Sequence, residues 1–403
     1  MGQLAGKRII IGVTGGIAAY KAAEWIRALR REEAEVQVVQ TAAAARFITP
    51  LTLAALSGHR VYEDIFSPEE AELIPHINLA RQCDLLLIAP ATAQTIAKLA
   101  HGQADNLLTA IALATRAPVL ICPAMNSNMY LHPATQANLE SLRQYGCIIA
   151  PPVAGAMACG DEGPGRLPDW RTVREYIATA LTPQDLQGIH FLITAGPTYE
   201  DIDPVRFIGN RSSGKMGYAL AGAARQRGAT VTLISGPSPL PDPPAITTIR
   251  VRSAREMAKF VHQEAPNAQI IIKAAAVADY SPLTTDSHKI KKGTASLELK
   301  LTANEDILKS LGESRGENTL PLLVGFAAES RDHLAHGLKK LKAKNLDLIV
   351  INDIGGSESA FANDNNQVII INRQGKKIEL PRLSKEETAH RLLDQLLPIL
   401  PSP

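Results

Sequence analysis

A threonine, Thr41, lies between two expected elements in a way that suits the binding of a phosphate group. The apolar run 36–40 reads as a strand, and residues 42–47 read as a helical segment. Backbone N–H groups and the helix dipole favour an anion at a helix N-terminus. Thr41 is an equally good candidate for an ordinary N-cap. The sequence alone leaves both interpretations open.

Two glycine loops could also approach phosphates, but neither matches a dinucleotide or P-loop pattern. Gly12, Gly15 and Gly16 lack the G-x-G-x-x-G spacing, and no acidic residue closes the second strand. Residues 209–216 (GNRSSGKM) match G-x-x-x-x-G-K, but Met216 replaces the Ser or Thr that binds magnesium, and the motif comes well after its strand. A Walker site is therefore rejected, although this open backbone could still bind phosphates or carboxylates.

The two glycine loops belong to two successive units of the chain, and each loop follows the first strand of its unit. An apolar run at 8–13 enters one glycine loop, and a second run at 191–194 enters Gly196 after the polar, helix-breaking stretch 182–185. Each reads as the first strand of an α/β unit. Further strands are expected at 36–40, 85–89, 119–122, 147–150, 229–234, 269–274, 346–351 and 367–371.

The fold class that follows is α/β, with two parallel-sheet (Rossmann-like or flavodoxin-like) domains in tandem. We expect them to span residues 1–184 and 185–403, and their ligands to gather at the carboxyl ends of the strands. The segments 281–300 and 309–319 are polar, which is compatible with mobile loops.

Composition excludes several classes of protein. With 403 residues, 45% hydrophobic and 20% charged, the chain is typical of a globular protein with more than one domain. The 42 Lys and Arg residues nearly balance the 40 Asp and Glu residues, and aromatic residues make up only 4%. We therefore expect no nucleic-acid partner and no membrane partner.

The four cysteines favour a reducing compartment. Cys83, Cys122, Cys147 and Cys159 have no CxxC spacing, which predicts neither a zinc site nor a disulfide framework. The N-terminal apolar run is too short for a signal peptide, and no stretch is long enough to span a membrane. The expected location is the cytoplasm.

An ordered series of motifs in the first half resembles the flavin-dependent cysteine decarboxylase family. The motifs are residues 15–21 (GGIAAYK), 47–50 (FITP), 76–77 (HI), 89–93 (APATA), 102–108 (GQADNLL), 123–129 (PAMNSNM) and 158–166 (ACGDEGPGR). Each is weak alone, and the ordered set is specific. The resemblance implies FMN bound by Gly15, Gly16, Ile17, Thr41, Phe47, Thr49, Thr92, Asp105 and Asn106.

The same resemblance implies roles for three side chains. The flavin would oxidise the cysteinyl thiol of the substrate, which makes the neighbouring carboxylate easy to lose as carbon dioxide. His76 fits a base or a positioning group, because imidazole titrates near neutrality. Asn126 fits recognition of the carboxylate, and Cys159 is the candidate proton donor in a glycine-rich flap. The structural alternatives are a surface histidine, a turn-forming asparagine and a buried cysteine.

A second ordered series resembles the phosphopantothenate–cysteine ligase family. Its motifs are residues 194–198 (TAGPT), 203–206 (DPVR), 210–217 (NRSSGKMG), 274–280 (AAAVADY), 289–292 (KIKK), 325–329 (GFAAE), 339–347 (KKLKAKNLD), 352–353 (ND) and 361–366 (FANDNN). Together the halves resemble the bifunctional coenzyme A biosynthesis family. That family joins cysteine to 4′-phosphopantothenate with CTP through an acyl-cytidylate, then decarboxylates the product to 4′-phosphopantetheine.

The ligase resemblance implies catalytic roles for Lys289, Asn210 and Arg206, with Asn210 and Arg206 recognising oxygens of the acyl intermediate. Nucleotide-binding residues are implied at Asp279, Lys289, Asn304, Asp306, Ile307, Phe326, Lys340 and Lys344, and Asp279 is also the candidate Mg²⁺ ligand. A triphosphate needs fixed cations and magnesium. The ordinary alternative for such a lysine run is a solvated face.

Two departures from the family patterns bear on these sites. Leu167 follows Arg166 where methionine is expected, which concerns the packing of the flap. Glu305 replaces the proline of the usual Asn-Pro-Asp-Ile, which frees one backbone φ angle and adds an N–H donor.

Three other interpretations compete with a bifunctional enzyme. A ligase with a vestigial flavin half is disfavoured because His76, Asn126 and Cys159 occur together. A flavin-fold regulatory subunit would not require the ligase motifs, and the glycine loops disfavour a double-Rossmann oxidoreductase. The family resemblance implies a homo-oligomer, with a trimer-based flavin half and a dimeric ligase half.

Overall fold

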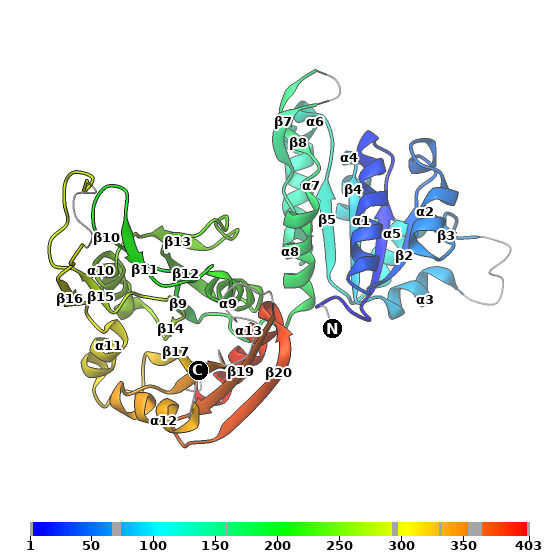
Figure 1. Cartoon of the computed structure of the whole chain (residues 1–403). Helices are drawn as coiled ribbons and strands as arrows, with labels where there is room; N and C mark the ends of the chain where they lie inside the picture. The colour runs from blue at the N-terminus through cyan, green and yellow to red at the C-terminus, as the bar shows by residue number, and fades with distance from the viewer. Residues whose placement is uncertain are drawn as a thin grey trace. The chain divides into compact units, whose positions relative to one another are not determined.

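The structure is a computed structural model, and it describes residues 3–66, 74–157, 160–291, 297–329, 333–353 and 365–400. The chain forms two compact units, residues 1–183 and 184–403. Each unit is an α/β layer structure built on one large sheet (Figure 1).

The sheet of the first unit is entirely parallel. Its strands lie in the order β3-β2-β1-β4-β5-β6, which is the 3-2-1-4-5-6 order of doubly wound nucleotide-binding folds. Their bounds are β1 (Arg8–Val13), β2 (Glu35–Gln40), β3 (Val61–Tyr62), β4 (Leu85–Ala91), β5 (Val119–Pro123) and β6 (Ile148–Ile149). The order reverses between β1 and β4, and such a reversal is where ligands bind in open α/β sheets.

Helices cover both faces of this sheet because successive strand residues point to opposite sides. Ile9 and Ile11 of β1 share a core with Trp25 of α1, whereas Ile10 shares a second core with Leu139 of α7. The helices are α1 (Tyr20–Arg31), α2 (Pro50–Ser57), α3 (Pro75–Gln82), α4 (Ala93–Ala100), α5 (Leu107–Ala114), α6 (Ser127–Leu131), α7 (Pro133–Gln144) and α8 (Trp170–Leu181). A hairpin of β7 (Val153–Ala156) and β8 (Glu162–Arg166) precedes α8.

The second unit repeats the strand order and then adds to it. Its eight-stranded sheet has the order β13-β12-β9-β14-β17-β18-β19-β20, in which β19 runs antiparallel to its two neighbours and all other neighbouring strands are parallel. The bounds are β9 (His190–Ala195), β12 (Thr230–Ser235), β13 (Thr247–Arg250), β14 (Ile270–Lys273), β17 (Leu322–Glu329), β18 (Leu348–Asp353), β19 (Asn365–Asn372) and β20 (Lys377–Ser384). The prediction of two α/β domains with parallel sheets is confirmed, and the second sheet is mixed only through β19. The strand expected at 367–371 is the antiparallel β19.

In the described part of the second unit, two helices cover one face of the sheet and three cover the other. On the first face are α9 (Lys215–Gln226) and α13 (Lys385–Asp394), and on the second are α10 (Ala254–Glu264), α11 (Ile307–Arg315) and α12 (His333–Ala343). Two small antiparallel sheets extend from the loops: β10 (Tyr199–Asp201) with β11 (Phe207–Gly209), and β15 (Tyr280–Pro282) with β16 (Leu301–Ala303). The helix α11 also occupies most of 309–319, a segment whose polarity was compatible with a mobile loop.

One buried arginine ties together the start and the end of the second unit. Arg227 is 4% exposed, and its guanidinium forms ion pairs with Asp185 at 2.7 Å and with Asp394 at 2.8 Å. The hydrogen bonds from Arg227 hold the pKa of Asp185 below its ordinary value. The first residues of this unit and the last turn of α13 therefore meet at one point.

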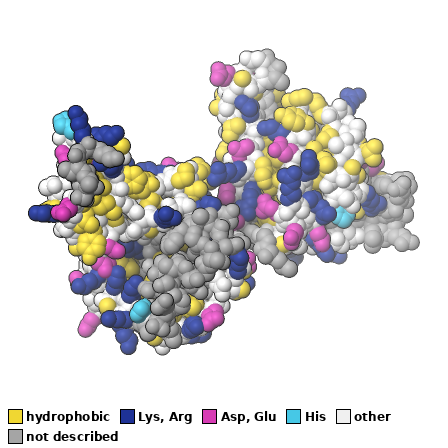
Figure 2. Space-filling model, viewed as in Figure 1, with side chains coloured by type: hydrophobic (Ala, Val, Ile, Leu, Met, Phe, Trp, Pro, Cys, Tyr) yellow, Lys and Arg dark blue, Asp and Glu magenta, His cyan; other side chains and the backbone are white. Residues whose placement is uncertain are grey.

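Charged side chains of both signs are mixed on the face of the molecule that Figure 2 shows, with lysine and arginine side chains interspersed among acidic ones in both units. Within the described part of the chain, no helix is both long and apolar enough to cross a bilayer.

Candidate active sites

In the first unit, the loops after four neighbouring strands carry most of the expected flavin-binding residues. Gly15 and Gly16 follow β1, Thr41 follows β2, and Thr92 follows β4. Asn126 lies after β5 in the same way. Parallel strands end at a common edge, so the sheet gathers these residues around its switch point.

A buried hydroxyl fixes the two loops at the switch point to each other. Thr14 is 1% exposed; its Oγ1 donates to the carbonyl of Pro90 at 2.6 Å and accepts from the backbone N–H of Thr92 at 3.0 Å. Because the hydroxyl that makes both bonds is buried, the relative position of these loops is set before any ligand arrives.

The loop after β1 needs glycine at one position and leaves space at the next. A Cβ added to Gly15 would lie 2.5 Å from the Cβ of Ala43, which no real side chain tolerates. A Cβ on Gly16 would meet nothing closer than 3.8 Å. Ile17, beside it, is 66% exposed, and Phe47 is also exposed. Glycine backbone that a phosphate can approach closely, together with exposed apolar side chains that a planar ring can cover, fits a planar group that carries a phosphate.

Three polar residues expected to hold the flavin, Thr49, Thr92 and Asn106, are helix N-caps, and Thr41 makes a similar bond. Oxygens of Thr41, Thr49, Thr92 and Asn106 accept from backbone N–H groups at 3.3, 3.4, 3.3 and 3.1 Å. Thr41 is not an N-cap, because the short 3-10 helix that follows covers Ala44–Arg46 and is capped at Ala43; its bond to the N–H of Ala44 closes a turn. Capping does not remove the other three residues from the site, because each helix so started points its N-terminus at the same sheet edge.

Asp105 is fixed beside the start of α5. Its carboxylate accepts from Lys98 at 2.6 Å and from the amide of Asn106 at 3.0 Å. The hydrogen bond with Lys98 holds the pKa of Asp105 below its ordinary value, so the group is ionised at neutral pH.

The hairpin β7–β8 lies against the loop that carries Asn126. The Asn126 side-chain amide donates to the Asp161 carboxylate at 2.6 Å, and its Oδ1 accepts from the N–H of Asn128 at 2.8 Å. Ser127 donates to the carbonyl of Pro164 at 2.8 Å. Cys159 itself lies outside the described residues. Its hairpin is nevertheless joined to Asn126, as a shared site for these two residues requires.

Leu167, the first departure, is buried in the main core of this unit, 3% exposed. Its carbonyl accepts from Lys21 at 3.3 Å. Leucine therefore anchors the base of the hairpin as an ordinary core residue.

His76 is half-buried in the first turn of α3, a helix that packs against α5. Its Nδ1 is buried and has no hydrogen-bond partner among the residues that the structure describes. A buried ring nitrogen without a partner is costly. This orphaned atom is available to a bound group, which suits a positioning or proton-handling role.

In the second unit, the candidate site is built around the loop 274–279 that follows β14. The amides of Asn210 and Asn304 each donate to this loop at 2.8 Å, to the carbonyls of Val277 and Ala278. Thr198 Oγ1 accepts from the N–H of Ala278 at 3.0 Å. Asn210 and Asn304, two of the predicted residues, thus hold the loop that carries Asp279, another predicted residue.

A buried carboxylate positions the segment that carries Lys289. Asp203 is 1% exposed and accepts from the backbone N–H groups of Val205 and Arg206 at 2.8 Å and of Ile290 at 3.2 Å. Arg206 donates to the Ile290 carbonyl at 2.9 Å. Burial would raise the pKa of Asp203, but these N–H donors outweigh it and the pKa lies below its ordinary value. Lys289 is exposed next to this clamp.

Asp306 and Lys344 meet on the other side of the loop. Asp306 caps α11 by accepting from the N–H of Lys309 at 3.2 Å, and it pairs with Lys344 at 2.7 Å. Burial would raise the pKa of Asp306, but the hydrogen bonds from Lys344 and from the N–H of Lys309, together with the nearby lysine charges, outweigh burial and leave the pKa below its ordinary value. Ile307 is buried at 1% exposure and anchors the same turn.

The remaining predicted residues are less closely joined to this group. Phe326 in β17 is half-buried against the core, and Lys340 is exposed on α12. Asp279 is exposed, and no cluster of three or more potential metal ligands occurs among the described residues. A single carboxylate suits Mg²⁺ that arrives with a nucleotide, because that ion keeps waters and phosphate oxygens as its other ligands.

The sequence motifs assigned no role to two residues of this site. Asp203 belonged to a motif but not to the predicted site, although a carboxylate before Pro204 is a typical loop-capping signal. Lys273 was counted within a buried strand. It ends β14, and burial lowers the pKa of its ammonium to about 8. A lysine at the end of an otherwise apolar strand was the signal that could have found it.

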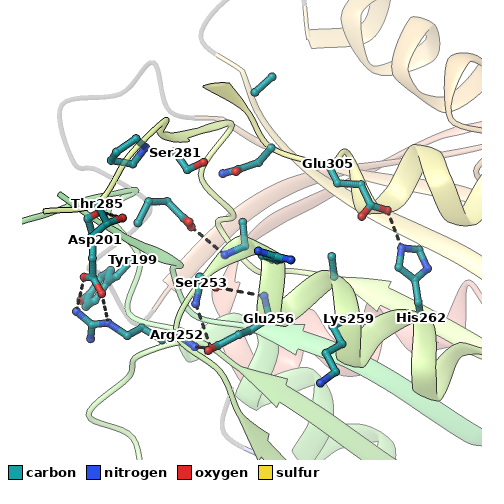
Figure 3. A pocket seen from close by; sticks show the side chains of 17 residues that line it. Tyr199, Asp201, Arg252, Ser253, Glu256, Lys259, His262, Ser281, Thr285 and Glu305 are labelled. Carbon is teal, nitrogen blue, oxygen red and sulfur yellow. Dashed lines mark hydrogen bonds and ion pairs between the residues drawn. The ribbon is translucent and has the colours of Figure 1, made fainter. Parts of the chain in front are cut away.

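Glu305, which stands where the family pattern has proline, contacts His262 of α10. His262 Nε2 and Glu305 Oε1 lie 2.6 Å apart and link α10 to the turn before α11 (Figure 3). Both residues line a pocket of about 660 Å³ between α10, β10 and the β15–β16 sheet. Asn304 joins this pocket to the candidate site, whereas Asp279 and Lys289 do not line it.

Comparisons with known proteins agree with the two halves. Residues 2–182 match the flavoprotein family model, and residues 186–399 match the model described as DNA/pantothenate metabolism flavoprotein C-terminal domain. The chain is 46% identical over 398 residues to the coenzyme A biosynthesis bifunctional protein CoaBC of Vibrio vulnificus, covering 98% of both chains. It is 44% identical over 399 residues to that of Escherichia coli, again covering 98% of both. The crystal structure of the FMN-dependent cysteine decarboxylase SpaF is 34% identical, with a TM-score of 0.39, covering 44% of this chain and 97% of that one.

Proposed function

The chain belongs to the CoaBC family of bifunctional coenzyme A biosynthesis enzymes, a cysteine ligase joined to a flavin-dependent phosphopantothenoylcysteine decarboxylase, and from this premise we propose how its residues divide the work. Residues 1–184 form the decarboxylase domain and residues 185–403 form the ligase domain. The observation that carries this division is the repeated strand order, with one set of candidate residues at each switch point.

In the ligase domain, the carboxylate of 4′-phosphopantothenate attacks the α-phosphorus of CTP and pyrophosphate leaves. The exposed ammonium of Lys289 stabilises the charge that develops on the phosphates. Asp279 would hold Mg²⁺, which would supply further positive charge at the same oxygens. Lys289 is kept in place by the Asp203 and Arg206 contacts to the backbone of Ile290.

Formation of the amide completes the ligation. The amine of cysteine attacks the acyl carbon of the acyl-cytidylate, CMP leaves and the amine loses a proton. Arg206 and Asn210 orient the acyl oxygen. Asn304, Asp306, Ile307, Phe326, Lys340 and Lys344 hold the nucleotide. The ordered backbone of the loop 274–279 is the platform against which these groups work.

In the decarboxylase domain, FMN fits the cradle beside Gly15 and Gly16 and the edge formed by Ile17, Thr41, Phe47, Thr49, Thr92, Asp105 and Asn106. When bound, the flavin supplies reversible oxidation of the substrate thiol, which allows carbon dioxide to leave. Asn126 donates its amide to the substrate carboxylate in place of Asp161. His76 positions the reacting end of the substrate through its orphaned Nδ1, and Cys159 returns a proton.

The proposed assembly is a homo-oligomer in the cytoplasm, with trimers of the flavin half and dimers of the ligase half. Apolar side chains on the small sheets of the second unit support a dimer contact there. Val205 and Phe207 at β11, Tyr280 and Leu283 at β15, and Leu301 in β16 are each 45–61% exposed, and exposed apolar side chains that gather in one place mark interaction surfaces.

The decisive assay supplies 4′-phosphopantothenate, cysteine, CTP and Mg²⁺ to the FMN-loaded protein and detects 4′-phosphopantetheine by mass. Omitting CTP should abolish product, and adding 4′-phosphopantothenoylcysteine without CTP should restore it. Replacing CTP by ATP tests the nucleotide. Equal rates with both nucleotides would contradict the assignment of CTP, and loss of product from 4′-phosphopantothenoylcysteine would contradict the decarboxylase assignment.

A further inference from the structure

The strand at the switch point of the ligase sheet ends in a lysine that has no part in the proposed mechanism. Lys273 is the last residue of β14, where it pairs with Thr194 of β9 on one side and Gly325 of β17 on the other. The strand order reverses between β9 and β14. Lys273 therefore lies at the position in the sheet where ligands of such folds bind.

The surroundings of its ammonium are charged but offer it no direct partner. The side chain is in the electrostatic field of Lys344 at the end of α12, Asp306 at the cap of α11 and Asp279 on the following loop. Asp306 is engaged by Lys344 at 2.7 Å. Lys273 forms no hydrogen bond or ion pair with any residue in the described ranges.

Burying a cation without a partner lowers the stability of the folded protein. A bound anion offsets this loss of stability because it pairs with the cation. Burial and the like charge of Lys344 disfavour the ammonium form and lower its pKa to about 8, while Asp306 and Asp279 partly oppose this. The side chain is thus still mostly protonated at neutral pH, and an incoming anion would stabilise its charge.

We propose that Lys273 is a nucleotide-binding residue of the ligase, whose ammonium pairs with a phosphate oxygen of CTP. This inference rests on the proposed function, because Asp279, Asp306 and Lys344 around it are the residues assigned to the nucleotide. Lys344 and Lys273 would then approach the phosphates from two neighbouring elements, while Lys289 approaches from the segment beyond β15.

The test compares Lys273→Met, which keeps length without charge, with Lys273→Arg, which keeps charge at every accessible pH. For CTP, Lys273→Met should weaken binding about 10- to 100-fold at pH 7, the usual size of a charge-assisted hydrogen bond. The Michaelis constants of the other two ligase substrates should change less than about twofold. Lys376→Met, in the exposed turn between β19 and β20, is the matched control and should leave all three quantities unchanged.

Measuring the protons taken up when CTP binds distinguishes a direct contact between Lys273 and CTP from a purely structural role of Lys273. Calorimetry of CTP binding in buffers of different ionisation enthalpy should show uptake of about half a proton at pH 8 by the wild type, because the anion raises the pKa of Lys273 from about 8. Both variants should lack this uptake. As pH rises through about 8, wild-type affinity should fall toward that of Lys273→Met while Lys273→Arg stays level.

Each outcome has one meaning. Unchanged affinity for CTP in Lys273→Met would overturn the inference, and so would an effect confined to the Michaelis constant of the pantothenate substrate. Failure of the wild type to ligate with CTP would instead overturn the proposed function. Decarboxylation of 4′-phosphopantothenoylcysteine by the same preparations reports that the chain is folded.

Discussion

The two units share one strand order but prepare for their ligands in different ways. In the first, the hydroxyls at the carboxyl ends of the strands already have backbone partners: Thr14 bonds to the neighbouring loop at Pro90, and Thr41 and Thr92 each bond to an N–H three residues on. In the second, cations remain at the edge without equivalent partners. Lys289 is exposed, and Lys273 is half-buried with no ion pair in the described chain.

The difference follows from the ligands that the two sites are proposed to take. A flavin is held by backbone, hydroxyl and apolar contacts, so a site for it can be complete and rigid in advance. A triphosphate brings several negative charges, so its site must keep positive charge uncompensated until it binds. An incomplete ion-pair network at a sheet edge therefore indicates an anionic ligand that comes and goes.

The largest effect should come from the flavin unit. We expect Cys159→Ser to lower formation of 4′-phosphopantetheine by roughly 10³-fold, in the range of a lost acid. The oxidised, decarboxylated intermediate, two hydrogens lighter than the product, should accumulate and can be detected by mass. CTP-dependent release of pyrophosphate should stay normal. A parallel fall in both activities would mean that the units are not independent.

Next in size is the matching change in the ligase unit. Lys289→Gln should reduce pyrophosphate release by about 10²- to 10³-fold, the usual result of removing one donor to a developing charge. Decarboxylation of supplied 4′-phosphopantothenoylcysteine is the control within the same protein. A variant that kept full turnover would show that the exposed cation is only a solvated surface residue.

A smaller effect tests how the cation is positioned. Asp203→Asn keeps one acceptor and loses the charge that holds the N–H of Ile290, and we expect a roughly 10-fold loss in kcat/KM for ligation through displacement of Lys289. Because the folded-state pKa of Asp203 is depressed, its contribution to stability is present above the unfolded pKa of about 3.9 and is lost as pH falls through the folded value.

Thermal unfolding across pH checks this sign. The Tm of Asp203→Asn should lie below that of the wild type near pH 7, and the two should converge in acid. A gap that widened on acidification would mean that Asp203 acts on stability by some route other than its charge.

The smallest effect concerns the ion pair of His262 with Glu305, the residue that stands where the family pattern has a proline. His262 and Glu305 are 36% and 47% exposed in their side chains, so Glu305→Gln should cost less than about 1 kcal/mol, or up to about 2–4 °C in Tm. Glu313→Gln, which removes an exposed Lys309 pair on α11, is the control. A loss well above that of the control would show that this pair stabilises the nucleotide turn.

Buried strands and loop positions could be predicted from the sequence because their signals are local. The run 85–89 is apolar throughout, and it forms the fully buried β4. The run 367–371 was expected as a strand, and it lies in β19, which pairs antiparallel with β18 and, across a short turn, with β20. A run of apolar residues predicts a strand but not the direction in which that strand pairs.

The candidate sites divide in the same way. Asn210 and Lys289 could be predicted because they belong to motifs, whereas the contribution proposed for Asp203 depends on a backbone group 87 residues away. The lowered pKa of Lys273 arises from burial and from charges on α11, α12 and the next loop. Such collective properties exist only after the chain has folded.

The ion pairs of Arg227 with Asp185 and Asp394 affect how the ligase unit can be cut or permuted. Asp185 and Asp394 meet at one guanidinium, so the two ends of this unit lie side by side and behave as a closed ring. A module closed in this manner can be cut from its neighbour, or circularly permuted by joining its ends and opening an exposed turn such as that at Gly375, at little entropic cost. Cleavage that removed α13 would instead open the ring and leave a buried guanidinium without one of its counter-charges.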